Sequence, residues 1–146
     1  MIRAFLDNDI EAILDIWLSG NKEAHAFIPE DYWISHLSFM REHLPQAEVY
    51  VAESRGHIQG FAGMTGDYLA GIFVSGSCRS AGIGTLLLDQ LKKVHAHISL
   101  KVYQENKRAL TFYQKQGFSI IRESLDTDTG YLEYVMSWDK ETSLLP

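Results

Sequence analysis

Residues 68–91 read YLAGIFVSGSCRSAGIGTLLLDQL, and they indicate how the chain folds. The first part, Tyr68–Val74, is an apolar run interrupted by Gly71 and predicts a strand. The last part belongs to the segment Gly82–Val94, whose large apolar side chains fall on one stripe of a helix. That stripe contains Ile83, Leu86, Leu87, Leu91 and Val94. The stretch therefore predicts a strand, a glycine-containing turn and an amphipathic helix in direct succession.

The turn, Arg79-Ser80-Ala81-Gly82-Ile83-Gly84-Thr85, has the chemistry of an anion-binding site. Two glycines that open a helix leave successive backbone N–H groups unpaired and allow a ligand to approach them closely. The helix dipole favours negative charge at the same place. Arg79 can add a bidentate contact and Thr85 a hydroxyl. The turn is therefore interpreted as a pyrophosphate cradle.

The same turn has three alternative interpretations, two of which its residues exclude. A P-loop needs a lysine directly after the second glycine, but Thr85 stands there. A Rossmann fingerprint needs a third glycine, but the residue at that position is Leu87. A glycine-rich helix start that binds no ligand stays open as the third.

A second motif lies about 20 residues further on, where residues 106–118 read NKRALTFYQKQGF. On a helix, Ala109 and Tyr113 share one face with Asn106, so a small residue, an amide and a phenol line one groove. Taken alone, Tyr113 is also typical of a packed aromatic residue whose hydroxyl reaches the edge of the core.

The remaining sequence predicts short elements in one continuous domain. A helix with apolar positions from Ile10 to Trp17 is expected to end at Gly20-Asn21, and a second, after Pro29, is expected to stop at Pro45. The segment Ser54-Arg55-Gly56-His57 predicts a hairpin turn. The other expected elements are Ile2–Phe5, Glu48–Glu53, Ile58–Met64, Ile98–Tyr103, Asn106–Gln116 (ended by Gly117), Phe118–Glu123 and Tyr131–Trp138.

The resulting order, β-α-α-β-β-β-α-β-α-β-β, indicates an α/β (α+β) fold with a mixed sheet and crossover helices. Residues 1–139 form the expected single domain, and residues 140–146 are expected to be a loose C-terminal tail.

Composition excludes several classes of protein. The chain has 146 residues, 46% of them hydrophobic, and a net charge of −6, which argues against a nucleic-acid or anionic-membrane binder. The single cysteine, Cys78, excludes an internal disulfide, and His95 with His97 lacks a third ligand, so no metal is expected. The start carries no signal segment, and no apolar run approaches the roughly 20 residues that span a bilayer. We expect a cytoplasmic protein.

The charge is unevenly distributed. Residues 1–70 have 4 basic and 11 acidic side chains, net −7, whereas residues 79–115 have 7 basic and 2 acidic, net +5. This division suggests an anionic ligand at the second region and a cationic one at the first. A solvated surface with charges scattered by chance is the alternative.

Together, the two motifs resemble those of the GNAT superfamily of acyl-CoA-dependent N-acetyltransferases. Its loop pattern, Gln/Arg-x-x-Gly-x-Gly/Ala, is matched by Arg79, Gly82 and Gly84. Its later pattern, Asn-x-x-Ala-x-x-Phe-Tyr-x-x-x-Gly-Phe, is matched by Asn106, Ala109, Phe112, Tyr113, Gly117 and Phe118. Within the family, the chain looks most like small bacterial RimI-like protein or peptide acetyltransferases. The resemblance implies a largely antiparallel central sheet with helices on both faces.

The resemblance also implies a site for acetyl-CoA, without a metal. The turn amides would hold the pyrophosphate, the strand backbone the pantetheine and thioester oxygen, and Lys107 or Lys115 the outer phosphate. The implied cofactor-binding residues are Ile72, Phe73, Val74, Arg79, Ser80, Ala81, Gly82, Ile83, Gly84, Thr85, Asn106, Ala109, Tyr113 and Lys115.

The implied reaction is direct attack of a primary amine on the thioester in a ternary complex. Tyr113 is expected to protonate the leaving thiolate, because a phenol at the end of the pantetheine channel is a donor of suitable reach. The general base is left open, since RimI-type enzymes carry a glutamate where this chain has Lys101. Candidates are Asp67, Glu53 and His25, each of which also fits a structural or surface role.

The acceptor is expected to be a protein lysine, an N-terminus or a small-molecule amine. Residues that could line its pocket are His25, Phe27, Tyr68 and Tyr103. The alternative function is an acyl-CoA binding or sensing domain with weak catalysis, which Lys101 keeps open. A monomer and a homodimer are both compatible with the sequence.

Overall fold

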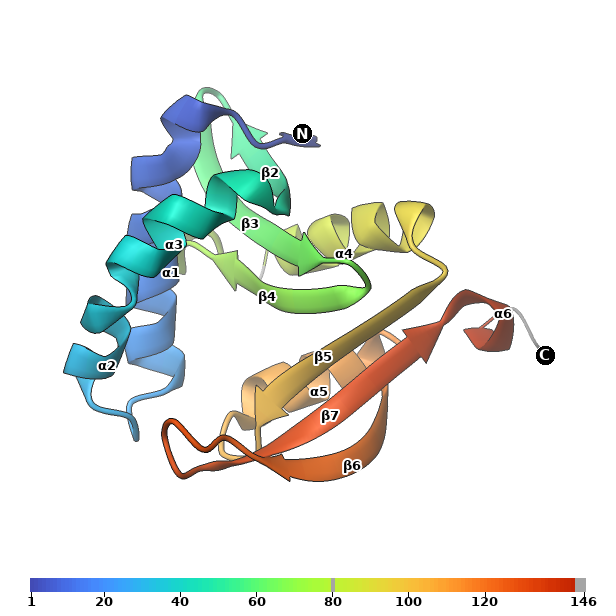
Figure 1. Cartoon of the computed structure of the whole chain (residues 1–146). Coiled ribbons are helices and arrows are strands. Elements are labelled where there is room, and N and C mark those ends of the chain that lie inside the picture. The colour runs from blue at the N-terminus through green and yellow to red at the C-terminus, as the bar shows by residue number, and fades with distance from the viewer. Residues whose placement is uncertain (80, 144–146) are drawn as a thin grey trace.

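The structure is a computed structural model that describes residues 1–79 and 81–143 (Figure 1). Short 3₁₀ turns lie at Asp7–Asp9, Leu44–Gln46 and Gly76–Cys78. The strands are β1 (Ile2–Ala4), β2 (Glu48–Ser54), β3 (His57–Thr65), β4 (Tyr68–Val74), β5 (His97–Tyr103), β6 (Ser119–Leu125) and β7 (Leu132–Asp139). The helices are α1 (Ile10–Ala24), α2 (Glu30–Ser35), α3 (Leu37–His43), α4 (Ile83–Val94), α5 (Lys107–Lys115) and α6 (Lys140–Ser143).

The described strands form one sheet in the order β1-β2-β3-β4-β5-β7-β6. Every neighbouring pair is antiparallel except β4 and β5, which run parallel. These two strands share a single bridge pair, Tyr68 with Ser99, and they diverge beyond it (Figure 1). The α+β fold with a mixed, largely antiparallel sheet is therefore confirmed. The divergence leaves the side of β4 that faces β5 without a ladder partner after its first residue.

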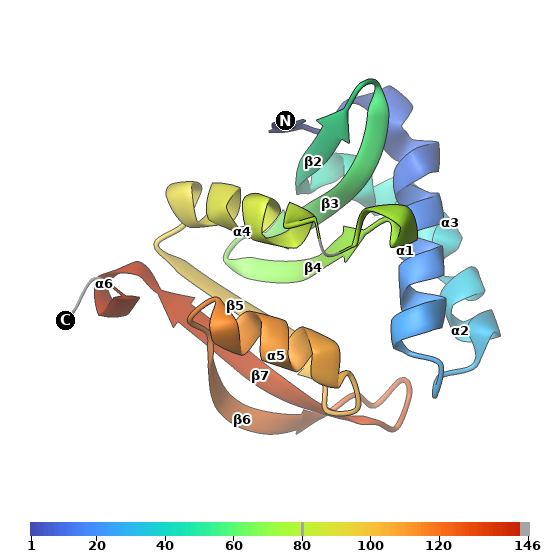
Figure 2. The ribbon, with the colours of Figure 1, turned by 180° about the vertical axis from the view of Figure 1, so that it is seen from behind.

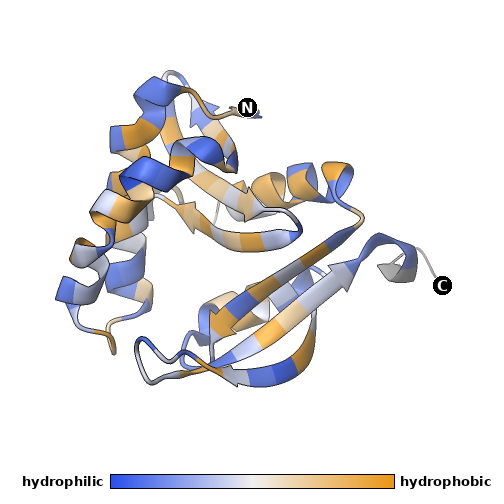
Figure 3. Ribbon diagram, viewed as in Figure 1, coloured by the Kyte–Doolittle hydropathy of each residue, from blue (hydrophilic) through white to orange (hydrophobic). Residues whose placement is uncertain are grey.

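Helices cover both faces of the sheet, as expected. Helices α1–α3 lie on one face, and α4 and α5 lie on the other (Figure 2). Strand β2 has the matching alternation, because Val49 and Val51 join the core under α1–α3 whereas Tyr50 and Ala52 pack toward α4. Hydrophobic residues accordingly fill much of β3 and β4, whereas hydrophilic bands recur along α1–α3 (Figure 3). None of the described helices is long and apolar enough to span a membrane.

The predicted hairpin between β2 and β3 is confirmed. Ser54 pairs with His57, and the two residues between them, Arg55 and Gly56, have φ angles of 52° and 77°. Two successive positive φ values are the geometry of a tight two-residue hairpin turn.

One predicted helix end is wrong, and one predicted helix is divided in two. Helix α1 continues through Gly20-Asn21 to Ala24, because Gly20 faces the ring of Phe73, where an added Cβ would lie 3.1 Å from Cδ1. The expected second helix is divided into α2 and α3 at His36. At this position the His36 imidazole Nδ1 donates to the carbonyl of Tyr32 at 2.6 Å. The backbone amide of His36 donates to the carbonyl of Trp33, three residues earlier, rather than to that of Tyr32, four residues earlier.

Two smaller expectations also need correction. On α4, Leu86 and Val94 are 49% and 53% exposed and Leu88 is buried, because the arc facing the sheet is centred on Leu87 and Leu91. Residues 140–143 form α6 instead of a loose tail, since the amide of Lys140 donates to the carbonyl of Ala96 at 2.8 Å. The rest of that expected tail, residues 144–146, lies outside the described residues.

Candidate active site

Strand β4 has a β-bulge near its middle. Gly63 pairs with Gly71 and Met64 with Leu69, which leaves Ala70 without a partner on β3. At Gly71, an added Cβ would lie 2.5 Å from Cε2 of Phe73, so the Phe73 ring folds back over this glycine. Gly71 therefore lies beside the bulge and leaves the Phe73 ring the space that a side chain would fill.

The turn before α4 has the predicted helix-opening geometry. Gly82 is the N-cap residue, with φ 79° and ψ 12°, and no side chain from the described part of the chain caps this helix end. The first-turn amides are therefore available to an anion. Gly84, in the first turn of α4, also packs closely against α5, because an added Cβ would lie 3.3 Å from Cζ of Phe112. The predicted residue Ser80 lies outside the described residues.

Charged groups from three elements meet beside this turn. The Arg79 guanidinium forms an ion pair with Glu23 on α1, and it lowers the pKa of that carboxyl; Arg108 on α5 acts in the same direction. The Thr85 hydroxyl accepts a hydrogen bond from Gln116 Nε2 at 3.1 Å. Arg108 was counted in the basic segment but not singled out from the sequence, because only the fold brings it close to Glu23.

Tyr113 lies in the core between α5 and the sheet. It is 8% exposed, and its ring packs edge-on against Phe112 and Phe118 at centroid distances of 5.2 and 5.5 Å. Its hydroxyl has no hydrogen-bond partner among the residues that the structure describes. Burial, and secondarily the charge of Tyr68, raise the pKa of Tyr113. The hydroxyl therefore stays protonated, and no described residue forms a hydrogen bond with it.

A chain of hydrogen bonds joins the C-terminal end of α1 to the N-terminal end of α5. Asn21, which is 2% exposed, donates through Nδ2 to the Trp17 carbonyl at 2.9 Å and accepts at Oδ1 from His25 Nδ1 at 3.0 Å. His25 Nε2 accepts from Asn106 Nδ2 at 3.0 Å, and Asn106 Oδ1 caps α5 by accepting from the Ala109 amide at 3.2 Å.

This arrangement sets the protonation state of His25. Burial lowers the pKa of His25 to about 4, so its ring is neutral and carries its proton on Nδ1. Both ring nitrogens are engaged, one by Asn21 and one by Asn106. His25 is therefore a structural link rather than a free base.

The structure gathers three of the four predicted acceptor residues in one aromatic cluster. The His25 ring lies 5.0 Å from Tyr103 and 5.8 Å from Phe27, and Phe27 lies 5.7 Å from Tyr103, all edge-on. Tyr68 lies apart, at the start of β4, where the strand meets β5. Burial and the charges of Glu133 and Asp126 raise the pKa of Tyr68.

Two carboxylates that the sequence analysis missed lie beside this cluster. The Tyr103 hydroxyl donates to Asp126, in the turn between β6 and β7. Burial opposes ionisation of Asp126, but hydrogen bonds from Tyr103, Asp128 and Thr129 outweigh it and lower the pKa of Asp126. Glu133 on β7 is half-buried, and burial followed by the charge of Asp126 raises its pKa. The pairing of β7 with β5 locates Glu133, and the bond from the Tyr103 hydroxyl locates Asp126; no local motif encodes either contact.

The other base candidates have partners elsewhere. Glu53 accepts from Arg3 Nη2 at 2.7 Å, at the end of β2, in a cluster that also contains Asp9. Asp67 lies in the turn before β4, 3.6 Å from His95 Nδ1. Lys101 is exposed on β5, where its charge favours ionisation of Glu133. The structure therefore does not bring Glu53 to the divergence of β4 and β5.

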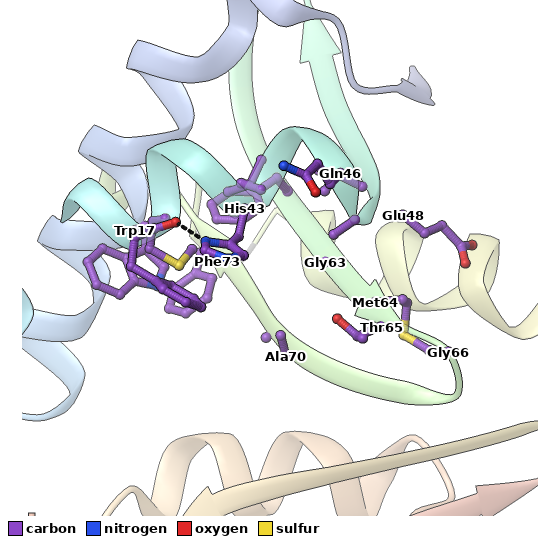
Figure 4. A pocket seen from close by; sticks show the side chains of 17 residues that line it. Trp17, His43, Gln46, Glu48, Gly63, Met64, Thr65, Gly66, Ala70 and Phe73 are labelled. Atoms are coloured by element: carbon purple, nitrogen blue, oxygen red, sulfur yellow. Dashed lines mark hydrogen bonds between the residues drawn. The ribbon is translucent and has the colours of Figure 1, made fainter. Parts of the chain in front are cut away.

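A pocket of about 620 Å³ lies on the face covered by α1–α3 (Figure 4). Its walls come from α1, α3, β3 and β4 and are mostly apolar; they include Trp17, Met40, Phe61, Ala70 and Phe73. The pocket thus reaches the bulge of β4 from the side opposite α4. Across residues 1–79 and 81–143, no group of three or more His, Cys, Asp or Glu side chains is arranged to hold a metal.

Comparison with known proteins identifies relatives over nearly the whole chain. A family model described as "Acetyltransferase (GNAT) domain" matches residues 45–120. The peptidyl-lysine N-acetyltransferase YiaC of Escherichia coli K12 is 36% identical over 140 residues, which cover 94% of this chain and 96% of YiaC.

Two solved structures are similar in fold. The solution structure of apo YjaB from Escherichia coli has a TM-score of 0.83 at 23% identity and covers 94% of this chain and 96% of YjaB. The PaiA N-acetyltransferase of Thermoplasma acidophilum, in complex with coenzyme A, has a TM-score of 0.81 at 19% identity, and the match covers 95% of this chain and 98% of PaiA.

Proposed function

Because the chain belongs to the GNAT acetyltransferase family, we propose that it transfers the acetyl group of acetyl-CoA to lysine side chains of proteins or peptides. The lysine acceptor is supported by YiaC, whose name specifies peptidyl-lysine. It is also supported by the carboxylates of Asp126 and Glu133 beside the aromatic cluster, because a cationic side chain is attracted there.

The residues around the α4 turn fit coenzyme A. The pyrophosphate would meet the uncapped amides that follow Gly82, and Arg79 and Arg108 would supply positive charge. The backbone of Ile72 and Val74, on the strand that diverges from β5, would take the pantetheine. Acetyl-CoA supplies the activated acyl group as a thioester.

The residues of this chain would then act in three ways. The bulged backbone of β4 offers hydrogen bonds to the oxygen that becomes negative in the transition state. The pocket and the diverging strands hold amine and thioester in line, which lowers the entropic cost of their meeting. The Tyr113 hydroxyl gives its proton to the leaving sulfur.

The observation that carries this proposal is Tyr113, whose ring is buried and whose neutral hydroxyl has no hydrogen-bond partner within the described residues. The side-chain atom that is fully buried without a partner in the described part of the chain is Trp33 Nε1, so the Tyr113 hydroxyl remains accessible to a ligand. Protonation of the leaving thiolate requires a neutral hydroxyl of this kind.

The test measures binding and turnover separately. We expect acetyl-CoA to raise the melting temperature, and free thiol to be released with lysine peptides. Tyr113→Phe is expected to lower kcat by about 10²-fold while leaving the shift by acetyl-CoA in place. Tyr50→Phe, a half-buried tyrosine on β2, is the matched control and is expected to keep wild-type activity.

Each contrary outcome has a distinct meaning. Binding of acetyl-CoA without turnover on any amine would favour the alternative function, a binding or sensing domain. Equal kcat for wild type and Tyr113→Phe would remove Tyr113 from the role of acid. Turnover only with small-molecule amines would exclude the peptidyl-lysine acceptor.

A further inference from the structure

The pairing of β5 with β7 places a carboxylate beside the predicted acceptor residues. Tyr103 and Glu133 are direct partners in this antiparallel pair, so their side chains lie on the same face of the sheet. That face is the one on which the Tyr103 ring contacts His25 and Phe27. Lys101 occupies the next position on the same face, paired with Val135.

Glu133 differs from Asp126 because no described residue forms a hydrogen bond or ion pair with its carboxylate, although the charges of Asp126 and Lys101 act on it. Its side chain is half-buried. Asp126 accepts bonds from Tyr103 and the Asp128 amide. Partial burial without a partner disfavours the ionised form, so this carboxylate takes up a proton more readily than an exposed one.

Tyr68 connects this carboxylate to the unpartnered hydroxyl on the other side of the sheet. The charge of Glu133 acts on Tyr68, and the charge of Tyr68 acts on Tyr113. Tyr68 is also the residue at which β4 and β5 begin to diverge. Two polar groups without a hydrogen-bond partner in the described structure, the Tyr113 hydroxyl and the Glu133 carboxylate, therefore lie on opposite faces of the sheet, and Tyr68 interacts electrostatically with both.

We propose that Glu133 is the catalytic base of this enzyme and accepts a proton from the ammonium group of the acceptor lysine. This inference rests on the proposed function. Glu133 takes the place of the acidic residue that the chain lacks at Lys101, one strand away on the same face of the sheet. Asp126, which its hydrogen bonds keep ionised, attracts the ammonium without taking its proton.

The proton balance closes. The lysine ammonium gives one proton to Glu133, and the free amine forms the new C–N bond as the C–S bond breaks. Sulfur takes the proton of the Tyr113 hydroxyl. The second proton on nitrogen leaves as the amide forms and restores Tyr113, and Glu133 passes its own proton to water.

The pH profile of the wild type should report Glu133. The titratable and charged groups that act on Glu133, or on the tyrosines beside it, are Tyr32, Tyr68, Lys101, Tyr103, Asp126 and Asp128. Among these groups, only Glu133 is a carboxylate with a raised pKa and no hydrogen-bond partner. Protonation of Glu133 should therefore lower kcat/KM on the acidic side of the pH profile.

The test compares Glu133→Gln with wild type from pH 7.5 to pH 9.5 on one lysine peptide. We expect kcat/KM to fall by about 10²-fold at pH 7.5, with an unchanged melting shift by acetyl-CoA. Without the base, the rate follows the free amine, which increases about tenfold per pH unit below the ordinary lysine pKa of about 10.4. At pH 9.5, kcat/KM of Glu133→Gln should therefore be only a few-fold below that of wild type. Glu133→Asp should retain part of the wild-type activity.

The control is Glu123→Gln, an exposed carboxylate on β6 that pairs with Tyr134 and so lies on the opposite face. It is expected to match wild type at every pH. A Glu133→Gln deficit that stays constant with pH, or appears only in the KM for the peptide, would overturn the role of base in favour of binding. Wild-type activity in Glu133→Gln would overturn it outright while leaving the proposed function intact. Absence of turnover by wild type would overturn both.

Discussion

Replacing His25 by phenylalanine keeps the ring and removes both of its nitrogens from the hydrogen-bonded chain between α1 and α5. The ring can still stack on Trp33, at a centroid distance of 5.4 Å. Two polar atoms lose their partners, the Oδ1 of the 2%-exposed Asn21 and the Nδ2 of Asn106. Each unsatisfied group costs about 1–3 kcal/mol when buried. Since Asn106 is partly exposed, we expect the free energy of unfolding at pH 7.5 to fall by about 2–4 kcal/mol.

The same substitution has a pH signature. The pKa of His25 is lowered from 6.5 to about 4 by burial, so the neutral ring contributes stability that is complete above pH 6.5. That stability is lost as the pH falls from 6.5 toward 4, because the unfolded chain takes up the proton first. The lowering corresponds to about 3 kcal/mol. The difference in unfolding free energy between wild type and His25→Phe should therefore decrease by up to about 3 kcal/mol as the pH falls from 6.5 toward 4.

Urea unfolding followed by circular dichroism, at steps from pH 7.5 to pH 4.5, measures both quantities. His57→Phe, on an exposed position of β3, is the matched control and should show no such gap. A double-mutant cycle with Asn106→Ala should be strongly non-additive, because the two changes break the same bond. A loss below about 0.5 kcal/mol, or a gap that does not depend on pH, would refute the reasoning.

Three further predictions concern single contacts. Gly71→Ala should cost about 1–3 kcal/mol in urea unfolding, because the added Cβ meets the Phe73 ring, and Phe73→Leu in the same chain should restore most of the loss. Glu23→Gln should lower the Kd for acetyl-CoA a few-fold by calorimetry, since it frees Arg79 for phosphate, and high salt should reduce the gain. Asp9→Asn should lower the unfolding free energy by about 2–4 kcal/mol in thermal denaturation, because the 5%-exposed Asp9 carboxylate pairs with a guanidinium.

Local chemistry made much of the fold predictable from sequence. The positive φ values at Arg55 and Gly56 follow from a short turn between two apolar runs, and the α4 turn follows from its glycines. The errors arose where a distant residue overrides a local rule. Gly20 does not end α1, because Phe73, more than 50 positions away, needs the space that a side chain would fill. The break at His36 depends on one side-chain bond to a carbonyl, which periodicity cannot indicate.

The candidate site was predictable to the extent that its residues lie in one motif. Gly82 and Tyr113 belong to such motifs, and the structure has Gly82 at the N-cap of α4 and Tyr113 in the core beneath α5. Glu133 belongs to none, because its position is set by the insertion of β7 between β5 and β6. A non-local strand pairing has no signature in a single sequence, so a base on β7 is visible only once the sheet order is known.

The single bridge between β4 and β5 also bears on how the molecule opens. With one pair joining them, the halves β1–β4 and β5–β7 share almost no ladder hydrogen bonds, whereas each half is internally bonded along its length. We expect native-state hydrogen exchange to resolve two cooperative units that open separately. The His25–Asn106 hydrogen bond also links the two halves of the sheet, because His25 follows α1 and Asn106 precedes α5. Loss of this bond should increase hydrogen exchange at the Ser99 amide before it affects the interior of either half.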